Sequence, residues 1–201
     1  NEKKFVFTSY PDLSDNTFAF FLHLDQKYSF YPIWLINDYG KKDYYNEIIK
    51  KYSKNNPVNF VRKKSFKGVY HYLTARFVFS THGIYKIFGR IKGHNSINLW
   101  HGMPIKNIEN LDRNNNSIPD SSNMYIVTSK FYQEKFTKIF NVESSSIFVT
   151  GLPRNDFLIN GKINNALNMP ISNIEELKTL EPYLNLANKI GQLQSQLSKG
   201  A

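Results

Sequence analysis

The sequence predicts an α/β fold built on a doubly wound, mainly parallel sheet. Short apolar runs alternate along the chain with amphipathic stretches of about ten residues, and strands separated by helices of that length form parallel sheets. Two of the apolar runs lead to a His-Gly pair, at the strand end where such sheets bind ligands. A chain of 201 residues provides one large domain, or one domain with an appendage, and can bury a sizeable core.

The expected strands are apolar runs, as is typical of strands buried in a parallel sheet. They fall at residues 4–9, 33–37, 58–62, 76–81, 97–101, 124–129 and 147–151.

The expected helices have apolar residues at helical spacing and fall between strands. They span residues 16–27, 44–52, 66–74 and 132–140. Asp15 is the expected cap of the first helix. Residues 107–123, rich in Asn, Asp and Ser, are expected to form a polar loop, and a polar loop of that length often serves as a lid or binds a ligand.

The most informative feature is a pair of histidines. The fourth expected strand leads into His82-Gly83 and the fifth into His101-Gly102. If both strands lie in one parallel sheet, the two imidazoles should face the same crevice beyond the carboxyl ends of the strands.

Composition excludes several kinds of site. The chain has no cysteine, so it has no disulfide, thiolate nucleophile or thiolate zinc site. Neither a G-x-G-x-x-G nor a G-x-x-x-x-G-K-[ST] sequence is present, which argues against a classical dinucleotide site and a P-loop. No apolar run approaches the length of a spanning helix, and no signal peptide is expected at the start.

The formal charge is +10, and lysines with interleaved aromatic residues crowd residues 41–67. Such a surface attracts phosphate polymers or anionic lipid headgroups. A solvated helix face is the alternative. No nucleic-acid-binding motif accompanies the charge, so specific nucleic-acid recognition is not expected.

Four short segments carry a resemblance to a known family. Residues 99–106 read Leu-Trp-His-Gly-Met-Pro-Ile-Lys, and residues 151–156 read Gly-Leu-Pro-Arg-Asn-Asp. The Ser-Asp-Asn of residues 14–16 and the Thr-His-Gly of residues 81–83 precede them. Together and in this order, they resemble the amino-terminal half of the CDP-glycerol glycerophosphotransferases, the teichoic acid polymerases and primases, over residues 4–160.

The resemblance implies a Rossmann-like domain, residues 1–160, as the acceptor-side half of a two-domain GT-B architecture. It implies CDP-glycerol as the donor and a membrane-linked polyol-phosphate acceptor. The expected location is the cytoplasm, peripheral on the inner face of the plasma membrane. No cofactor and no metal are expected. The donor-binding half is expected to be missing, so the chain alone should be inactive.

Three residues are candidates for catalysis. Transfer from CDP-glycerol needs a base with a pKa near neutrality, and His101 suits that role by position and by resemblance. A buried histidine bonded to the backbone is the alternative. His82 either orients the acceptor or stabilises its turn. Asp156 either orients His101 or the acceptor hydroxyl, or, like Asn155, caps the helix that follows.

Other residues of the same segments are candidates for acceptor or phosphate binding. Lys106 either pairs with an acceptor phosphate or faces solvent. Asp15 and Asn16 either cap the first helix or bind the acceptor. Arg154 and Asn155 complete the binding set. The residues expected to shape the turns are Gly83, Gly102, Pro104, Gly151 and Pro153.

Residues 161–201 are expected to form a helical C-terminal appendage, since leucines recur there at helical spacing. Within it, residues 163–198 resemble a segment of D-3-phosphoglycerate dehydrogenase that leaves the catalytic core. No nicotinamide-binding motif accompanies that segment, so dehydrogenase activity is not inferred.

Two other functions remain open from the sequence. The chain could be a non-catalytic basic module that binds anionic polymer or a membrane surface. It could also be a related capsule sugar-phosphate transferase.

Overall fold

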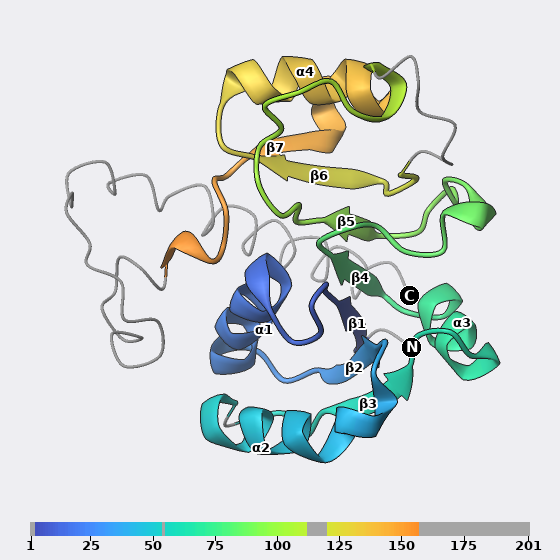
Figure 1. Ribbon diagram of the computed structural model, residues 1–201, viewed down its shortest axis with the longest axis vertical. Helices are drawn as coiled ribbons and strands as arrows, with labels where there is room; N and C mark the ends of the chain where they lie inside the picture. Colours follow the sequence, from blue (N-terminus) through green and yellow to red (C-terminus); the bar gives the residue numbers. More distant parts are fainter. Residues whose placement is uncertain (1–2, 54, 112–119, 157–201) are drawn as a thin grey trace, which may run out of the picture.

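The seven predicted strands form one sheet in which every neighbouring pair is parallel. The computed structural model describes residues 3–53, 55–111 and 120–156 (Figure 1). Within them the strands are β1 Lys4–Thr8, β2 Tyr31–Ile36, β3 Asn59–Arg62, β4 Phe77–Ser80, β5 Ser96–Asn98, β6 Met124–Val127 and β7 Ile147–Val149. Their order across the sheet is β3-β2-β1-β4-β5-β6-β7. The predicted doubly wound α/β fold is therefore confirmed, while the appendage at residues 161–201 lies outside the described residues.

The four predicted helices are also present within the described residues, with ends that differ by one or two residues from the prediction. They are α1 Asp15–Lys27, α2 Lys42–Tyr52, α3 Phe66–Leu73 and α4 Lys130–Phe140. Short 3-10 helices were not predicted and occur at η1 Tyr39–Lys41, η2 Lys86–Phe88, η3 Glu109–Leu111 and η4 Ser144–Ser146.

The predicted helix cap at Asp15 is wrong. Asp15 is the first residue of α1, and Ser14 holds the cap position without a side-chain capping bond. The Asp15 carboxylate instead accepts a bond from Arg154, 139 positions away in the sequence. Asn16 does not cap α1 either, because its side-chain amide bonds to residues 99, 100 and 154. By contrast, Ser65 caps α3 by accepting a hydrogen bond from the backbone of Gly68.

Alternating strand residues face two separate layers of helices. On one face, Phe7 and Trp34 belong to the large core that also contains residues of α1 and α2. On the other face, Val6 and Ile33 pack with Tyr72 of α3. A third cluster of buried side chains joins β6 and β7 to α4. Figure 1 shows α1 and α3 on opposite sides of the central strands, with α4 beside β6 and β7.

The strand order reverses between β1 and β4. From β1 the chain winds outward to β2 and β3, returns through α3 to β4 on the other side of β1, and then continues to β7. In open α/β sheets, ligands bind beyond the carboxyl ends of the strands at this point of reversal. The loops after β1 and β4, residues 9–14 and 81–85, flank it.

The fifth strand is shorter than predicted, ending at Asn98 rather than at residue 101. The Asn98 side chain accepts a hydrogen bond from the Trp100 backbone at 2.8 Å, and the Leu99 and Trp100 carbonyls accept bonds from Asn16. These side-chain bonds replace the ladder to β6 and turn the chain. Trp100 consequently has φ +55°, a left-handed conformation that costs energy for a bulky residue.

Candidate active site

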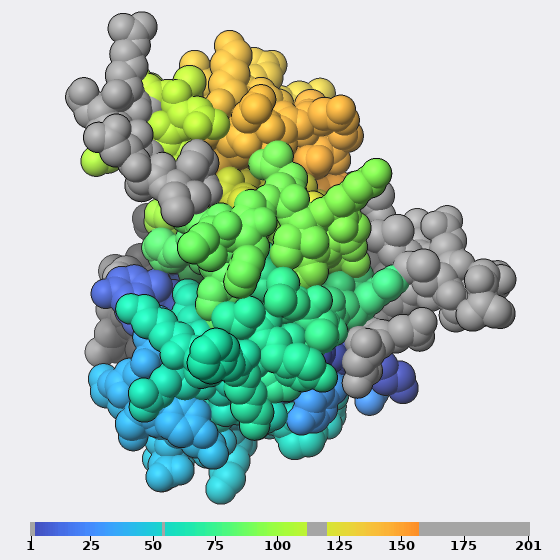
Figure 2. All heavy atoms as spheres, turned by 90° about the vertical axis from the view of Figure 1, so that its right-hand side faces the viewer, coloured from blue at the N-terminus to red at the C-terminus, as the bar shows by residue number. Residues whose placement is uncertain are grey.

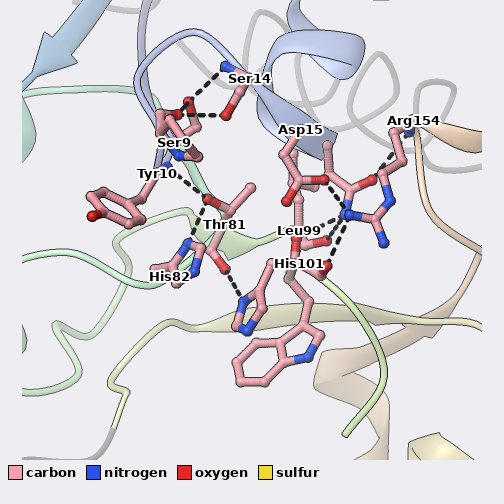
Figure 3. A network of polar contacts seen from close by, with 12 residues as sticks. Ser9, Tyr10, Ser14, Asp15, Thr81, His82, Leu99, His101 and Arg154 are labelled. Carbon is pink, nitrogen blue, oxygen red and sulfur yellow. Dashed lines mark hydrogen bonds and ion pairs between the residues drawn. The ribbon is translucent and has the colours of Figure 1, made fainter. Parts of the chain in front are cut away.

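The two predicted histidines lie together at the carboxyl edge of the sheet. Their imidazole rings stack in parallel, with centroids 4.1 Å apart and an angle of 4° between the planes. Figure 3 shows both rings below Thr81, with Asp15 and Arg154 on the far side of His101. The Trp100 ring also packs against His101, at 4.6 Å between centroids. This stacking confirms the part of the prediction that places both imidazoles together at one edge of the sheet.

A single residue, Thr81, holds both rings. Its backbone carbonyl lies 3.1 Å from Nδ1 of His101, and its hydroxyl lies 2.9 Å from Nδ1 of His82. A carbonyl only accepts hydrogen bonds, so Nδ1 of His101 must donate the proton. The neutral ring then carries its lone pair on Nε2, which no described residue bonds. This tautomer leaves Nε2 able to accept a proton, as a general base must.

His82 is electrically different from its partner. Desolvation by burial, followed by the nearby charge of His101, lowers the pKa of His82 to about 4. The ring is therefore neutral at physiological pH. Tyr10 packs edge-on against the same ring, and its backbone N–H donates to the Thr81 hydroxyl at 3.4 Å. His82 is thus suited to packing and hydrogen bonding rather than to carrying charge.

Asn16 joins three segments that are far apart in the sequence. The residue is fully buried. Its Nδ2 donates to the carbonyls of Leu99 and Trp100, at 3.2 and 2.8 Å, and its Oδ1 accepts from the backbone of Arg154 at 3.1 Å. Every bond fixes the backbone next to His101. Asn16 is therefore placed to position the base rather than to touch an acceptor.

Arg154 closes the other side of the His101 loop. Its Nη1 donates to Oδ1 of Asp15 at 2.7 Å and to the His101 carbonyl at 2.9 Å. The Arg154 side chain is 42% exposed, so the guanidinium also faces solvent. The other guanidinium atoms remain able to contact an anion beside His101.

Glycines at both histidine turns take backbone conformations that other residues rarely adopt. Gly83 has φ +68°, and a Cβ there would lie 2.1 Å from a carboxylate oxygen of the buried Asp120. Only glycine fits between the His82 turn and that carboxylate. Gly102 has φ +154°, and a Cβ there would first meet Arg154, at 3.7 Å. Gly151 also has positive φ, and its N–H donates to the Val127 carbonyl.

The remaining predicted residues take less central positions. Asp156 is half-buried, and burial raises its pKa to about 6. The Thr81 carbonyl, rather than Asp156, holds Nδ1 of His101. Lys106 and Asn155 are exposed, while Pro104 is half-buried and Pro153 buried. Neither Lys106 nor the Asn155 side chain has a polar partner among the described residues.

Three residues that shape the site were not predicted as part of it. Asp120, only 3% exposed, accepts a bond from Asn98 at 2.6 Å and lies beneath Gly83, so it supports both histidine turns. Asn98 passes that support to the Trp100 backbone. Thr81 acts mainly through its carbonyl, which no sequence pattern identifies. Asp120 lies in the predicted polar loop, whose residues 112–119 fall outside the described ones.

Two negative findings apply to the described residues only. Among residues 3–53, 55–111 and 120–156, no group of three or more His, Asp or Glu side chains is arranged to hold a metal ion. In the same ranges, no helix has the length and apolar character needed to cross a membrane.

Comparisons with known proteins bear on the fold and the family. A teichoic acid poly(glycerol phosphate) polymerase of Bacillus spizizenii is 28% identical over 177 residues, which cover 79% of this chain and 42% of the polymerase. The solved structure of the wall teichoic acid polymerase TagF superposes with a TM-score of 0.65 at 19% identity, covering 85% of this chain and 45% of that one. A TagF histidine variant soaked with CDPG gives a TM-score of 0.66.

These relatives are longer proteins, and this chain spans less than half of their length. The likeness to TagF supports the fold. A family model for CDP-glycerol:poly(glycerophosphate) glycerophosphotransferases matches residues 1–177. This match continues past residue 160, where the sequence predicted a domain boundary. The chain therefore belongs to the CDP-glycerol:poly(glycerophosphate) glycerophosphotransferase family.

Proposed function

We propose that this chain provides the acceptor-side half of a glycerol-phosphate transfer site, in which His101 is the general base. One observation carries the proposal: the Thr81 carbonyl fixes Nδ1 of His101 as a donor, so Nε2 offers its lone pair at the sheet edge. Family membership makes CDP-glycerol the proposed donor and a polyol-phosphate chain the proposed acceptor.

In the proposed reaction, a hydroxyl oxygen at the end of the acceptor attacks the β-phosphorus of CDP-glycerol. The new phosphorus–oxygen bond forms as the bond to the CMP oxygen breaks, and CMP leaves with the bonding electrons. Nε2 of His101 takes the proton from the attacking hydroxyl. Arg154, held by Asp15 beside His101, supplies positive charge near the phosphate being transferred.

The donor site belongs, in this proposal, to the second half of a GT-B architecture. Support comes from the described sheet, which accounts for one Rossmann-like half, and from the relatives, of whose length the match with this chain covers 42% and 45%. The chain by itself should then bind CDP-glycerol poorly. Calorimetry with the 201-residue chain tests this, and micromolar affinity would show that the donor site lies within it.

The general-base role is tested by CMP release from CDP-glycerol, with a glycerol-phosphate oligomer as acceptor. The protein should contain this sequence together with a donor-binding half. His101→Ala should abolish most of the release, while His94→Ala should not, since His94 bonds to the Tyr72 carbonyl away from the stacked rings. Equal rates for wild type and the folded His101 variant would remove His101 from the chemistry.

We also propose that the protein works at the cytoplasmic face of the plasma membrane. The support is an exposed apolar stripe on α3, called here the α3 stripe: Phe66, Tyr70 and Leu73, which are 97%, 59% and 47% exposed. Ile87 and Phe88 of η2 are exposed as well. Figure 2 looks onto this side and shows α3 in teal next to the green atoms that follow β4.

Charge around the α3 stripe supports the same proposal. Residues 48–108 contain lysine and arginine but no aspartate or glutamate. The basic cluster at residues 41–67 is divided in the fold: part lies on α2, which packs on one face of the sheet, and part at the start of α3, which packs on the other. Exposed aromatic residues with nearby lysines are typical of contacts with anionic lipid surfaces.

Vesicle sedimentation tests the membrane proposal. Phe66→Ser with Tyr70→Ser should reduce binding to vesicles that contain anionic lipid, and binding should weaken as salt rises. Phe131→Ser is the matched control, because Phe131 is 59% exposed on α4, outside the stripe. Similar losses for the control, or binding that ignores salt, would refute the proposed contact.

A further inference from the structure

Lys63 stands at the same edge of the sheet as the two histidines, directly after β3. Its backbone is fixed on both sides. The N–H donates to the Ile36 carbonyl at 2.8 Å, and the carbonyl accepts bonds from the Tyr85 hydroxyl and from the Ser65 N–H. The first turn of α3 packs against this carbonyl, since a Cβ on Gly68 would lie 2.6 Å from it. The base of the Lys63 side chain is therefore held firmly.

The backbone of Lys63 contacts the loop after β4, because the Tyr85 hydroxyl donates to the Lys63 carbonyl. The charge of Lys63 acts on Asp12, in the loop after β1, and on His82, in the loop after β4. These two loops flank the reversal point. The residue is half-buried, and burial lowers the pKa of Lys63 despite the opposing effect of Asp12. A charge placed there is poorly solvated by water alone.

No carboxylate within the described residues pairs directly with Lys63. The Asp12 carboxylate accepts bonds from the backbone N–H groups of Asn37 and Asp38, at 2.8 and 3.0 Å, and from the Asn37 amide at 2.9 Å. It is thus engaged in holding the loop after β2.

Two other cations near His82 and His101 do have such partners. Lys86 pairs with Glu109 at 3.2 Å, and Arg154 pairs with Asp15 at 2.7 Å. Of these three cations, Lys63 is the one that has no direct carboxylate partner among the described residues. A buried charge is retained at a cost unless something compensates for it.

We propose that Lys63 anchors a phosphate ester of the substrate beside the stacked histidines. The proposal rests on the proposed function, which supplies phosphate esters on both acceptor and donor. An ammonium on a flexible stem serves as a point charge for such groups. A phosphate bound there would provide the missing counter-charge and would hold the adjacent hydroxyl near His101.

The test compares Lys63→Met with Lys64→Met. Lys64 is the next residue but is exposed, so its variant controls for net charge. The probe is sn-glycerol 3-phosphate, with binding followed by calorimetry on the 201-residue chain. Lys63→Met should weaken binding about tenfold or more, as expected for loss of a charged hydrogen bond, and Lys64→Met less than about twofold. CMP in place of glycerol 3-phosphate distinguishes a donor phosphate from an acceptor phosphate.

The titration of His82, followed by NMR, gives a second readout that a merely structural lysine would not produce. In the wild type, glycerol 3-phosphate should raise the pKa of His82, because an anion between the two groups favours the charged ring. Lys63→Met should raise this pKa without ligand and should abolish the effect of ligand. Lys63→Arg keeps the charge and should restore phosphate binding if Lys63→Met folds poorly.

Several outcomes would overturn the anchor. These are equal binding by wild type and Lys63→Met, equal losses in both Met variants, or a loss confined to Lys106→Met. The proposed function fails separately, by unchanged CMP release in His101→Ala. Phosphate binding that depends on Lys63 without any role for His101 in transfer would leave the anion site standing and reject the enzyme assignment.

Discussion

His82 and His101 both precede a glycine at the end of a strand, yet different atoms hold their rings. The backbone carbonyl of Thr81 accepts from Nδ1 of His101, and the side-chain hydroxyl of the same threonine lies against Nδ1 of His82. A carbonyl permits one direction of hydrogen bond, while a hydroxyl permits both. His101 therefore has a fixed tautomer, whereas the hydroxyl leaves that of His82 free.

The loops around the two rings also differ in how their backbone is held. Next to His101, the backbone is held by Asn16 and Arg154, and Trp100 is kept in a left-handed conformation. Next to His82, Gly83 rests on the buried Asp120. Strained backbone that is held by several partners is common where a side chain must be aimed. The comparison indicates that His101 is the aimed residue and His82 its support.

The largest expected effect separates the two rings by substitution. His101→Ala should lower the rate of CMP release by two to four decades, roughly 3 to 5 kcal/mol, because the proposed general base is lost. His82→Ala should lower it by about tenfold or less, since His101 keeps its bond to the Thr81 carbonyl. Measuring both variants in the same transfer assay decides the matter, and a larger loss for His82→Ala would reverse the assigned roles.

The next effect concerns the loop that aims His101. Asn16→Ala removes three hydrogen bonds from a fully buried position and leaves two carbonyls and one N–H without partners. Unfolding free energy should fall by about 3 kcal/mol, measured in urea. Asn95→Ala is the control, because Asn95 makes one side-chain bond, to the Arg76 carbonyl, and should cost about 1 kcal/mol. Equal losses of unfolding free energy in the two variants would mean that the three bonds of Asn16 stabilise the fold no more than the single bond of Asn95.

A smaller effect should separate the hydroxyl from the carbonyl of Thr81. Thr81→Val removes the hydroxyl that contacts His82 but keeps the carbonyl that holds His101. We expect a loss of about 1 kcal/mol in unfolding free energy and a transfer rate within about threefold of wild type. A rate loss as large as that of His101→Ala would contradict a base held by the backbone alone.

The sequence predicts the sheet well because buried parallel strands must be apolar. Residues 33–36, for instance, are fully buried, and a short apolar run of this kind is typical of a strand in the middle of a parallel sheet. It also predicts that the two histidines meet, since parallel strands place their carboxyl ends at one edge. Both inferences depend on local pattern and topology alone.

What the sequence could not predict depends on contacts between distant residues. Leu99 and Trp100 look like more strand, but Asn16 and Asn98 bond their backbone and end β5 early. Asp15 has the sequence position of a helix cap, but its carboxylate accepts a hydrogen bond from Arg154, which lies 139 residues later in the chain. The role of the Thr81 carbonyl cannot be predicted from the sequence, because every residue has a backbone carbonyl.

The last expected effect is a dependence of stability on pH, to which His82 and Asp156 contribute in opposite directions. The pKa of His82 is lowered to about 4 in the folded chain, so between pH 6.5 and 4 the unfolded chain binds a proton that the folded chain does not. Its contribution to stability therefore falls as pH falls through that range. The pKa of Asp156 is raised to about 6, so between about pH 4 and 6 the folded chain keeps a proton that the unfolded chain releases.

Because the contribution of Asp156 to stability rises as pH falls from 6 to 4, the two residues offset each other in acid. Asp156→Asn should therefore make the protein more sensitive to acid than wild type, and His82→Asn less sensitive. Urea unfolding at pH 4.5, 5.5, 6.5 and 7.5 measures both differences, and comparison with wild type cancels the other titrating groups. If the two variants shifted acid sensitivity in the same direction, the assigned environments of His82 and Asp156 could not both be right. A shift confined to His82→Asn would retain the distinction between the two histidines while rejecting the burial of Asp156.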